Sequence, residues 1–136
     1  DKRGKGADLG NLGLVYAELG ETKKAIEYYE QALAIASEIG DRRSEGNALG
    51  NLGISRMNLG ETKKAIECYE QTLAIARELG DRRSEGNALW NMSLALDQLG
   101  DRAQAIECAK AALMIREDLE DPGAERVRRK LQEWEK

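Results

Sequence analysis

The chain has 136 residues, a formal net charge of −4, and 41% hydrophobic and 34% charged residues. This length supports one domain with a continuous core, and the acidic balance argues against nucleic acid or an anionic membrane as partner. We expect no signal peptide, and no apolar run in this sequence approaches the roughly 20 residues that span a bilayer.

The beginning of the chain already belongs to a repeating pattern with a period of 40 residues. The segments Glu21–Gly60 and Glu61–Gly100 are identical at 28 of 40 positions, and Asp1–Gly20 aligns with the segment that starts at Asp41. Because the sequence opens on Asp1 without an initiator Met, we expect a fragment of a longer protein. Such self-similarity predicts a solenoid in which each unit contacts only its neighbours.

Each unit is predicted to contain two helices of about 18 residues, each near 27 Å long. Gly20, Gly60 and Gly100 follow a Leu and precede an acidic residue, which is typical of a helix end and a tight turn. Asp41 and Asp81 are predicted N-caps. The predicted helices span residues 2–19, 22–39, 42–59, 62–79, 82–99 and 102–119.

A seventh helix is predicted to close the stack, with Asp121 as its N-cap and Pro122 as its first residue. One apolar stripe and a polar outer face suit a terminal helix that has no further neighbour. The stripe consists of Ala124, Val127, Leu131 and Trp134.

The spacing Leu9-x2-Leu12-Gly13-x2-Tyr16, followed by Ala25, Tyr29 and Ala32, resembles the tetratricopeptide repeat signature. The 40-residue period is similar to the long-repeat subclass found in Pins-type adaptors, kinesin light chain and bacterial signalling proteins. The third unit is looser, since Met92, Ser93 and Ala109 replace the leucine, glycine and aromatic residue. The resemblance implies an all-α, right-handed α-solenoid of three hairpins (1–40, 41–80, 81–120) with a C-terminal capping helix (121–136).

Glycines inside the predicted helices indicate close helix packing. We expect Gly13 and Gly53, opposite Ala25 and Ala65, to let the two helices of a hairpin approach each other. A mid-helix glycine costs up to about 1 kcal/mol relative to alanine, so close packing must offset it.

A helical wheel separates two arcs on the first helix of the second unit. Ala48, Leu49, Leu52, Gly53 and Leu59 form the predicted core arc, into which Arg56 intrudes. We expect Arg56 to pack its stem and to find water or a carboxylate for its head. Arg43, Asn47, Gly50, Asn51, Ile54 and Asn58 form the other arc, which the resemblance places along a concave groove.

The groove arc aligns Asn11, Asn51 and Asn91 at unit spacing. An amide offers a donor and an acceptor, which suits the backbone of an extended peptide; the alternative is that these amides bond to a neighbouring helix or to water. The predicted peptide-binding residues are Asn11, Asn47, Asn51, Asn87, Trp90, Asn91, Arg43, Arg83, Ile54, Asn58 and Leu94.

Two groove residue types allow alternative interpretations. Arg3, Arg43 and Arg83 suit acidic ligand side chains, but each also follows a helix start and could be a solvated charge. Trp90 replaces Gly10 and Gly50, and it suits either an exposed binding anchor or packing against the neighbouring repeat.

Catalysis and metal binding are not expected. The chain has no His and two cysteines, Cys68 and Cys108, which are predicted to be one repeat apart, too distant for a disulfide and reduced in the cytoplasm. No cofactor or nucleophile context is present, so the chain is predicted not to be an enzyme.

We therefore expect a module that binds a protein or peptide in its groove. The alternatives are a structural array that self-associates through its N-terminal hairpin, and a sensor arm of a larger signalling protein.

Overall fold

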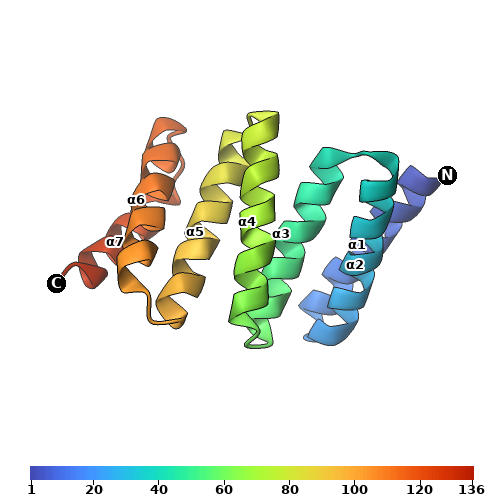
Figure 1. Ribbon diagram of the computed structural model, residues 1–136, viewed down its shortest axis with the longest axis horizontal. Coiled ribbons are helices and arrows are strands. Elements are labelled where there is room, and N and C mark those ends of the chain that lie inside the picture. Colours follow the sequence, from blue (N-terminus) through green and yellow to red (C-terminus); the bar gives the residue numbers. More distant parts are fainter.

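The computed structural model describes all residues, 1–136, and contains seven helices and no strand. The helices lie side by side in one row, with the two chain ends at opposite ends (Figure 1). This is the all-α solenoid that the sequence predicts. The helices are α1 (Lys2–Glu18), α2 (Thr22–Ile39), α3 (Arg42–Asn58), α4 (Thr62–Leu79), α5 (Arg82–Gln98), α6 (Arg102–Asp118) and α7 (Ala124–Trp134).

The helices pair as the repeat predicts. Helices α1 and α2, α3 and α4, and α5 and α6 form hairpins, and each hairpin packs on the next through its second helix. The terminal helix α7 packs on α6. No helix is both long enough and apolar enough to cross a membrane.

The turns confirm the glycine prediction and shorten the first helices by one residue. Gly20, Gly60 and Gly100 have φ angles of 79°, 79° and 88°, in the left-handed region that glycine adopts without strain. The preceding leucines Leu19 and Leu59 are C-caps rather than helical residues. Leu59 is 38% exposed, so its assignment to the core arc was wrong.

Helix α7 begins two residues later than predicted. Pro122 and Gly123 form a turn, and the Asp121 carboxylate accepts a hydrogen bond from the Gly123 N–H at 2.7 Å instead of capping a helix that starts at Pro122. Glu120 before this turn has a φ of 55°, at the position where Gly40 and Gly80 stand in the other units. The predicted apolar stripe of α7 is confirmed, because all four of its residues are buried.

The glycines of the first helices accommodate a tyrosine ring of the second helix. A Cβ atom added at Gly13 would lie 2.5 Å from Cε1 of Tyr29, and the same contact joins Gly53 to Tyr69. Both rings are 2% exposed, and burial raises the pKa of Tyr69 to about 12. The glycines therefore allow close packing of the two helices, and the tyrosine ring is a contact that the sequence did not indicate.

The third hairpin exchanges both partners of this contact. Ser93 stands at the glycine position and Ala109 at the tyrosine position, and both side chains are fully buried. The Ser93 hydroxyl donates to the Trp90 carbonyl at 2.6 Å. A larger residue on one helix is therefore accompanied by a smaller one on the other.

Arg56 confirms the expectation of a carboxylate partner. Its side chain is 20% exposed and donates to Glu61 at 2.8 Å, with Glu30 of the preceding hairpin at 3.8 Å. These contacts raise the pKa of Arg56 and lower that of Glu61. Arg56 therefore links the first hairpin, through Glu30, to the second hairpin, through Glu61.

Two alanine substitutions on one helix should have opposite effects on stability. Gly10 has no atom within 4 Å of an added Cβ, so Gly10→Ala should raise the free energy of unfolding by up to about 1 kcal/mol. Gly13→Ala should lower it by about 1–3 kcal/mol, because the methyl group overlaps the Tyr29 ring. Urea unfolding measures both; equal effects of the two substitutions would contradict the proposed packing.

Candidate functional site

Two consecutive clefts lie along the face formed by α1, α3 and α5. The first has a volume of about 480 Å³ and lies between α1 and α3, with α2 as its floor. The second has about 260 Å³ and lies between α3 and α5, with α4 as its floor. Asn47 and Asn51 line both clefts, so the two form one groove across the repeats.

The groove contains most of the predicted asparagines. Asn11 lines the first cleft, and Asn87 and Asn91 line the second. Asn11, Asn47, Asn51 and Asn91 make no side-chain hydrogen bond within the protein, and no amide atom of theirs is buried without a partner. Their donors and acceptors therefore face solvent in the groove. Asn87 differs, because its Oδ1 accepts from Arg116 at 3.2 Å.

Small residues keep the groove open. Nothing lies within 4 Å of a Cβ added at Gly10, and at Gly50 the nearest atom is Cγ2 of Thr72 at 3.9 Å. Trp90 occupies the equivalent position on α5 and is only 7% exposed, within the core cluster that includes α7. The interpretation of Trp90 as an exposed anchor was wrong. Its side chain instead packs within the core cluster that includes residues of α7.

The groove arginines bind aspartates of the protein itself. Arg43 donates to Asp81 at 3.1 Å, and Arg83 makes the same contact with Asp121 at 3.1 Å. The first pair joins the start of α3 to the N-cap of α5, and the second joins the start of α5 to the segment before α7. Both arginines remain more than 60% exposed, and neither is only a solvated charge, because each is paired with an aspartate of the protein. Of the two, only Arg43 lines a cleft.

Of three further predicted residues, one lines a cleft and two do not. Ile54 is 46% exposed and lines the second cleft. Asn58 and Leu94 line neither cleft: Asn58 is the exposed last residue of α3, and Leu94 is half-buried against the core. A helical wheel does not show that Asn58 lies at the end of α3 beyond the cleft, or that Leu94 packs against the core cluster, which includes residues of α7.

The tetratricopeptide repeat family profile matches residues 7–56 and 44–118. The chain belongs to the tetratricopeptide repeat family. No curated protein sequence matches it significantly.

Solved structures of tetratricopeptide repeat type have the same fold at low sequence identity. Apo RapI superposes with a TM-score of 0.94 at 19% identity over 99% of this chain and 50% of its own. The TPR domain of Arabidopsis FLU superposes with a TM-score of 0.83 at 22% sequence identity, over 87% of this chain and 99% of its own length. A Rap protein complexed with Competence and Sporulation Factor superposes with a TM-score of 0.87 at 22% sequence identity, over 98% of this chain and 38% of its own length. The chain thus spans about half the length of RapI.

The sequence analysis of this tetratricopeptide repeat chain missed the groove floor. The second helices supply it, with Ala32 and Ile35 in the first cleft and Thr72 and Ile75 in the second. It also missed Arg116, which stands at the position of Ala36 and Ala76. Comparing the units position by position would have found it, because an arginine replaces an alanine that is 3% exposed in both other repeats.

The two thiols of the tetratricopeptide repeats lie away from the two clefts. Cys68 and Cys108 are free and half-buried, and neither lines a cleft. Burial raises the pKa of both thiols, so they are predominantly protonated at neutral pH.

The charge of Asp81 at the groove edge should make stability depend on pH. The Ser84 hydroxyl and N–H and the Arg43 guanidinium lower its pKa, so its contribution is full above the unfolded-state value and is lost as the pH falls through the folded-state value. Asp81→Asn keeps the N-cap and removes the charge. Between about pH 5 and pH 2, the urea midpoint should fall less in this variant than in the wild type. If the urea midpoints of the two proteins fall equally as the pH is lowered, the stabilising role of the Asp81 charge is contradicted.

Proposed function

We propose that the chain binds an extended segment of a protein partner in the groove of α1, α3 and α5. The observation that carries the proposal is the row of four asparagines with no hydrogen-bond partner in the protein, along two connected clefts. A side-chain amide both donates and accepts, as the N–H and C=O of an extended backbone require. The apolar floor, with Ile35 and Ile75, suits side chains of the same segment.

Two further observations support a peptide ligand. Gly10 and Gly50 leave room for a backbone to approach α1 and α3 closely. A Rap protein with the same fold has been solved in complex with Competence and Sporulation Factor. Tetratricopeptide repeats commonly mediate protein–protein interaction, so we infer a non-catalytic binding module.

The test compares asparagines inside and outside the clefts. A partner recovered by affinity capture is titrated against the wild type, an Asn51→Ala/Asn91→Ala double variant and the control Asn58→Ala. The double variant should bind about tenfold or more weakly, because each lost hydrogen bond is worth about 0.5–1.5 kcal/mol. Asn58→Ala should bind like the wild type, since Asn58 lies on α3 beyond the clefts.

The proposal fails if the double variant binds its partner as tightly as the wild type does. Thermal unfolding of all three proteins checks that the substitutions leave the fold intact. A loss of affinity in Asn58→Ala equal to that of the double variant would also contradict it, because the effect would not be specific to the groove.

One observation favours self-association as a second function. Leu12 and Val15 on α1 are 41% and 51% exposed, whereas the equivalent residues Leu52 and Ser55 on α3 are 4% and 2% exposed against the preceding repeat. With Leu19, 66% exposed, they form an apolar stripe at helical spacing that no element of this chain covers.

Sedimentation velocity distinguishes the two functions. If the stripe joins copies of the chain, the wild type should dimerise as its concentration rises, and Val15→Glu should remain monomeric because a buried charge opposes association. A wild type that stays monomeric at all concentrations would exclude self-association through α1.

A further inference from the structure

A third cleft, of about 770 Å³, continues the groove between α5 and α7 and differs in chemistry from the first two. Trp90 lines it from α5, and α7 supplies charged residues in place of asparagines. Arg116 of α6 also lines it, at the position where Ala36 and Ala76 form the floors of the other clefts. The C-terminal end of the groove is therefore lined with cationic side chains, although the chain as a whole has a net charge of −4.

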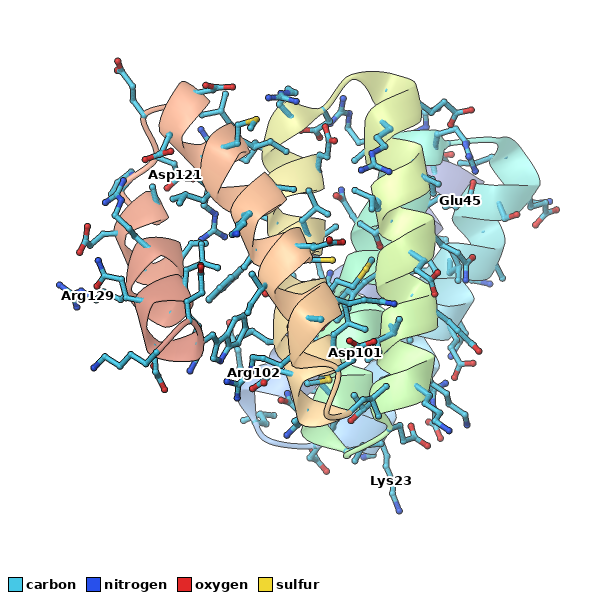
Figure 2. All side chains as sticks on the ribbon, turned by 60° about the vertical axis from the view of Figure 1, so that its left-hand side comes forward. Lys23, Glu45, Asp101, Arg102, Asp121 and Arg129 are labelled. Atoms are coloured by element: carbon cyan, nitrogen blue, oxygen red, sulfur yellow. The ribbon has the colours of Figure 1, made fainter.

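Two cations of this cleft have no carboxylate partner. Two others do have one: Arg129 is paired with Glu125 at 3.3 Å and points away from the other helices (Figure 2), and Lys130 lies 3.7 Å from Glu133. Arg116 and Arg126 have no carboxylate oxygen within 4 Å, in contrast to most arginines of the chain. Both residues line this third cleft.

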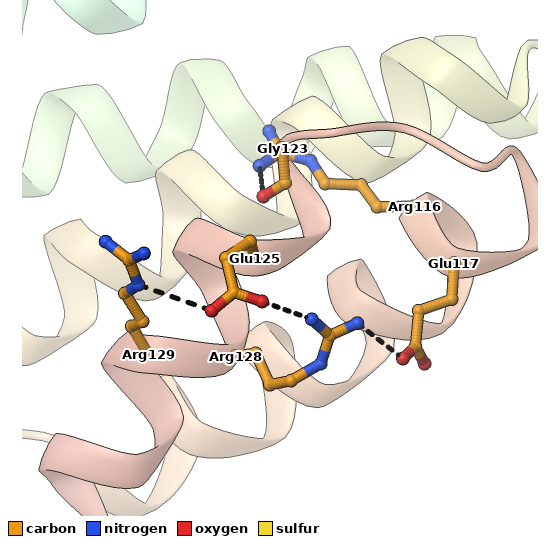
Figure 3. Close-up of polar contacts among 6 residues, drawn as sticks. All are labelled: Arg116, Glu117, Gly123, Glu125, Arg128 and Arg129. Atoms are coloured by element: carbon orange, nitrogen blue, oxygen red, sulfur yellow. Dashed lines mark hydrogen bonds and ion pairs between the residues drawn. The ribbon is translucent and has the colours of Figure 1, made fainter.

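Arg116 makes only neutral contacts. Its Nη1 donates to the Gly123 carbonyl at 3.2 Å, as the dashed line in Figure 3 shows, and its Nη2 donates to Oδ1 of Asn87 at 3.2 Å. The guanidinium lies 5.8 Å from the Trp90 ring centroid, and its Nε is buried without a hydrogen-bond partner.

The carboxylate of Asp121 makes no ion pair with Arg116 and is paired with Arg83 instead. Asp121 accepts hydrogen bonds from the Gly123 N–H and from Arg83. Burial lowers the pKa of Arg116, and the charge of Asp121 offsets this only in part. A partly desolvated guanidinium without a counter-ion gains more from an incoming carboxylate than an exposed one does.

We propose that this third cleft binds the carboxylate of an acidic side chain, Asp or Glu, in the same partner segment whose backbone lies along the first two clefts. This rests on the proposed function and adds the composition of the ligand, with its acidic residue at the α7 end of the groove. The amide-lined clefts select for an extended backbone, and the end beside α7 selects for an acidic residue.

The local charges favour a single carboxylate over a polyanion. Arg116 and Arg126 offer two unneutralised guanidinium groups, and a planar carboxylate matches their fork of N–H donors. Glu125 and Glu133 also line the cleft and would repel a nucleic acid or another extended anion. Because Arg116 lines the second cleft too, the acidic residue would lie next to the part of the segment that contacts Asn87 and Asn91.

The test is selection of a random linear peptide library against the whole chain. Selected peptides that lose affinity on Asn51→Ala/Asn91→Ala are taken as groove ligands and titrated against Arg126→Gln and Arg128→Gln. Arg126 makes no intramolecular ion pair, so its substitution should not affect folding. Arg128 is the matched control, because it removes the same charge from α7 while binding Glu117 and Glu125 rather than lining the cleft (Figure 3).

We expect groove ligands to be enriched in Asp or Glu at one fixed position, and Arg126→Gln to weaken them roughly tenfold. Arg128→Gln should have no such effect, and replacing the acidic residue by Gln in the peptide should remove the difference between wild type and Arg126→Gln. Groove ligands without acidic enrichment, or equal affinities for the two arginine variants, would overturn this inference and leave the groove proposal standing. If no selected peptide depends on Asn51 and Asn91, the proposed function itself fails, and the inference fails with it.

Discussion

The close contact between a helical glycine and a buried tyrosine ring determines how the first two hairpins are built. Where Gly13 meets Tyr29 and Gly53 meets Tyr69, no Cβ atom separates the helices. The tyrosine rings fill the space between the helices and also line the clefts from below, since Tyr29 lines the first and Tyr69 the second. The packing that stabilises the hairpin thus also shapes the groove floor. In the third hairpin Ser93 and Ala109 replace this pair, and the groove changes character at the same repeat.

Polar contacts between units hold the repeats in register along the groove edge. Arg43 binds Asp81, and Arg83 binds Asp121, so the same interaction recurs one repeat apart. Asp81 also caps its own helix through Ser84, and this carboxylate therefore links helix initiation to repeat stacking. The pairs are largely exposed and each is worth little alone, but the same contact recurs at the last two junctions of the stack, between the second and third repeats and between the third repeat and the segment before α7.

The sequence predicted the fold closely because the period itself encodes it. Two nearly identical units, glycine turns and aspartate N-caps determined six helices to within one residue, and helical spacing gave the buried stripe of α7. It also placed Asn11, Asn51 and Asn91 on one face. The errors concern contacts between units: Trp90 is covered by elements from other parts of the chain, and Arg43 is paired with a residue of the next repeat. A helical wheel describes one helix and does not determine which neighbour reaches each of its residues.

The central claim is that the groove asparagines are free to bond to a ligand backbone. Side-chain amide NMR signals of the asparagines, recorded during titration with a captured partner segment, test it most directly. We predict that the signals of Asn11, Asn47, Asn51 and Asn91 shift together, while that of Asn58 does not move. Binding that leaves the groove asparagines unchanged and shifts only signals of the outer helices α2, α4 and α6 would contradict the account.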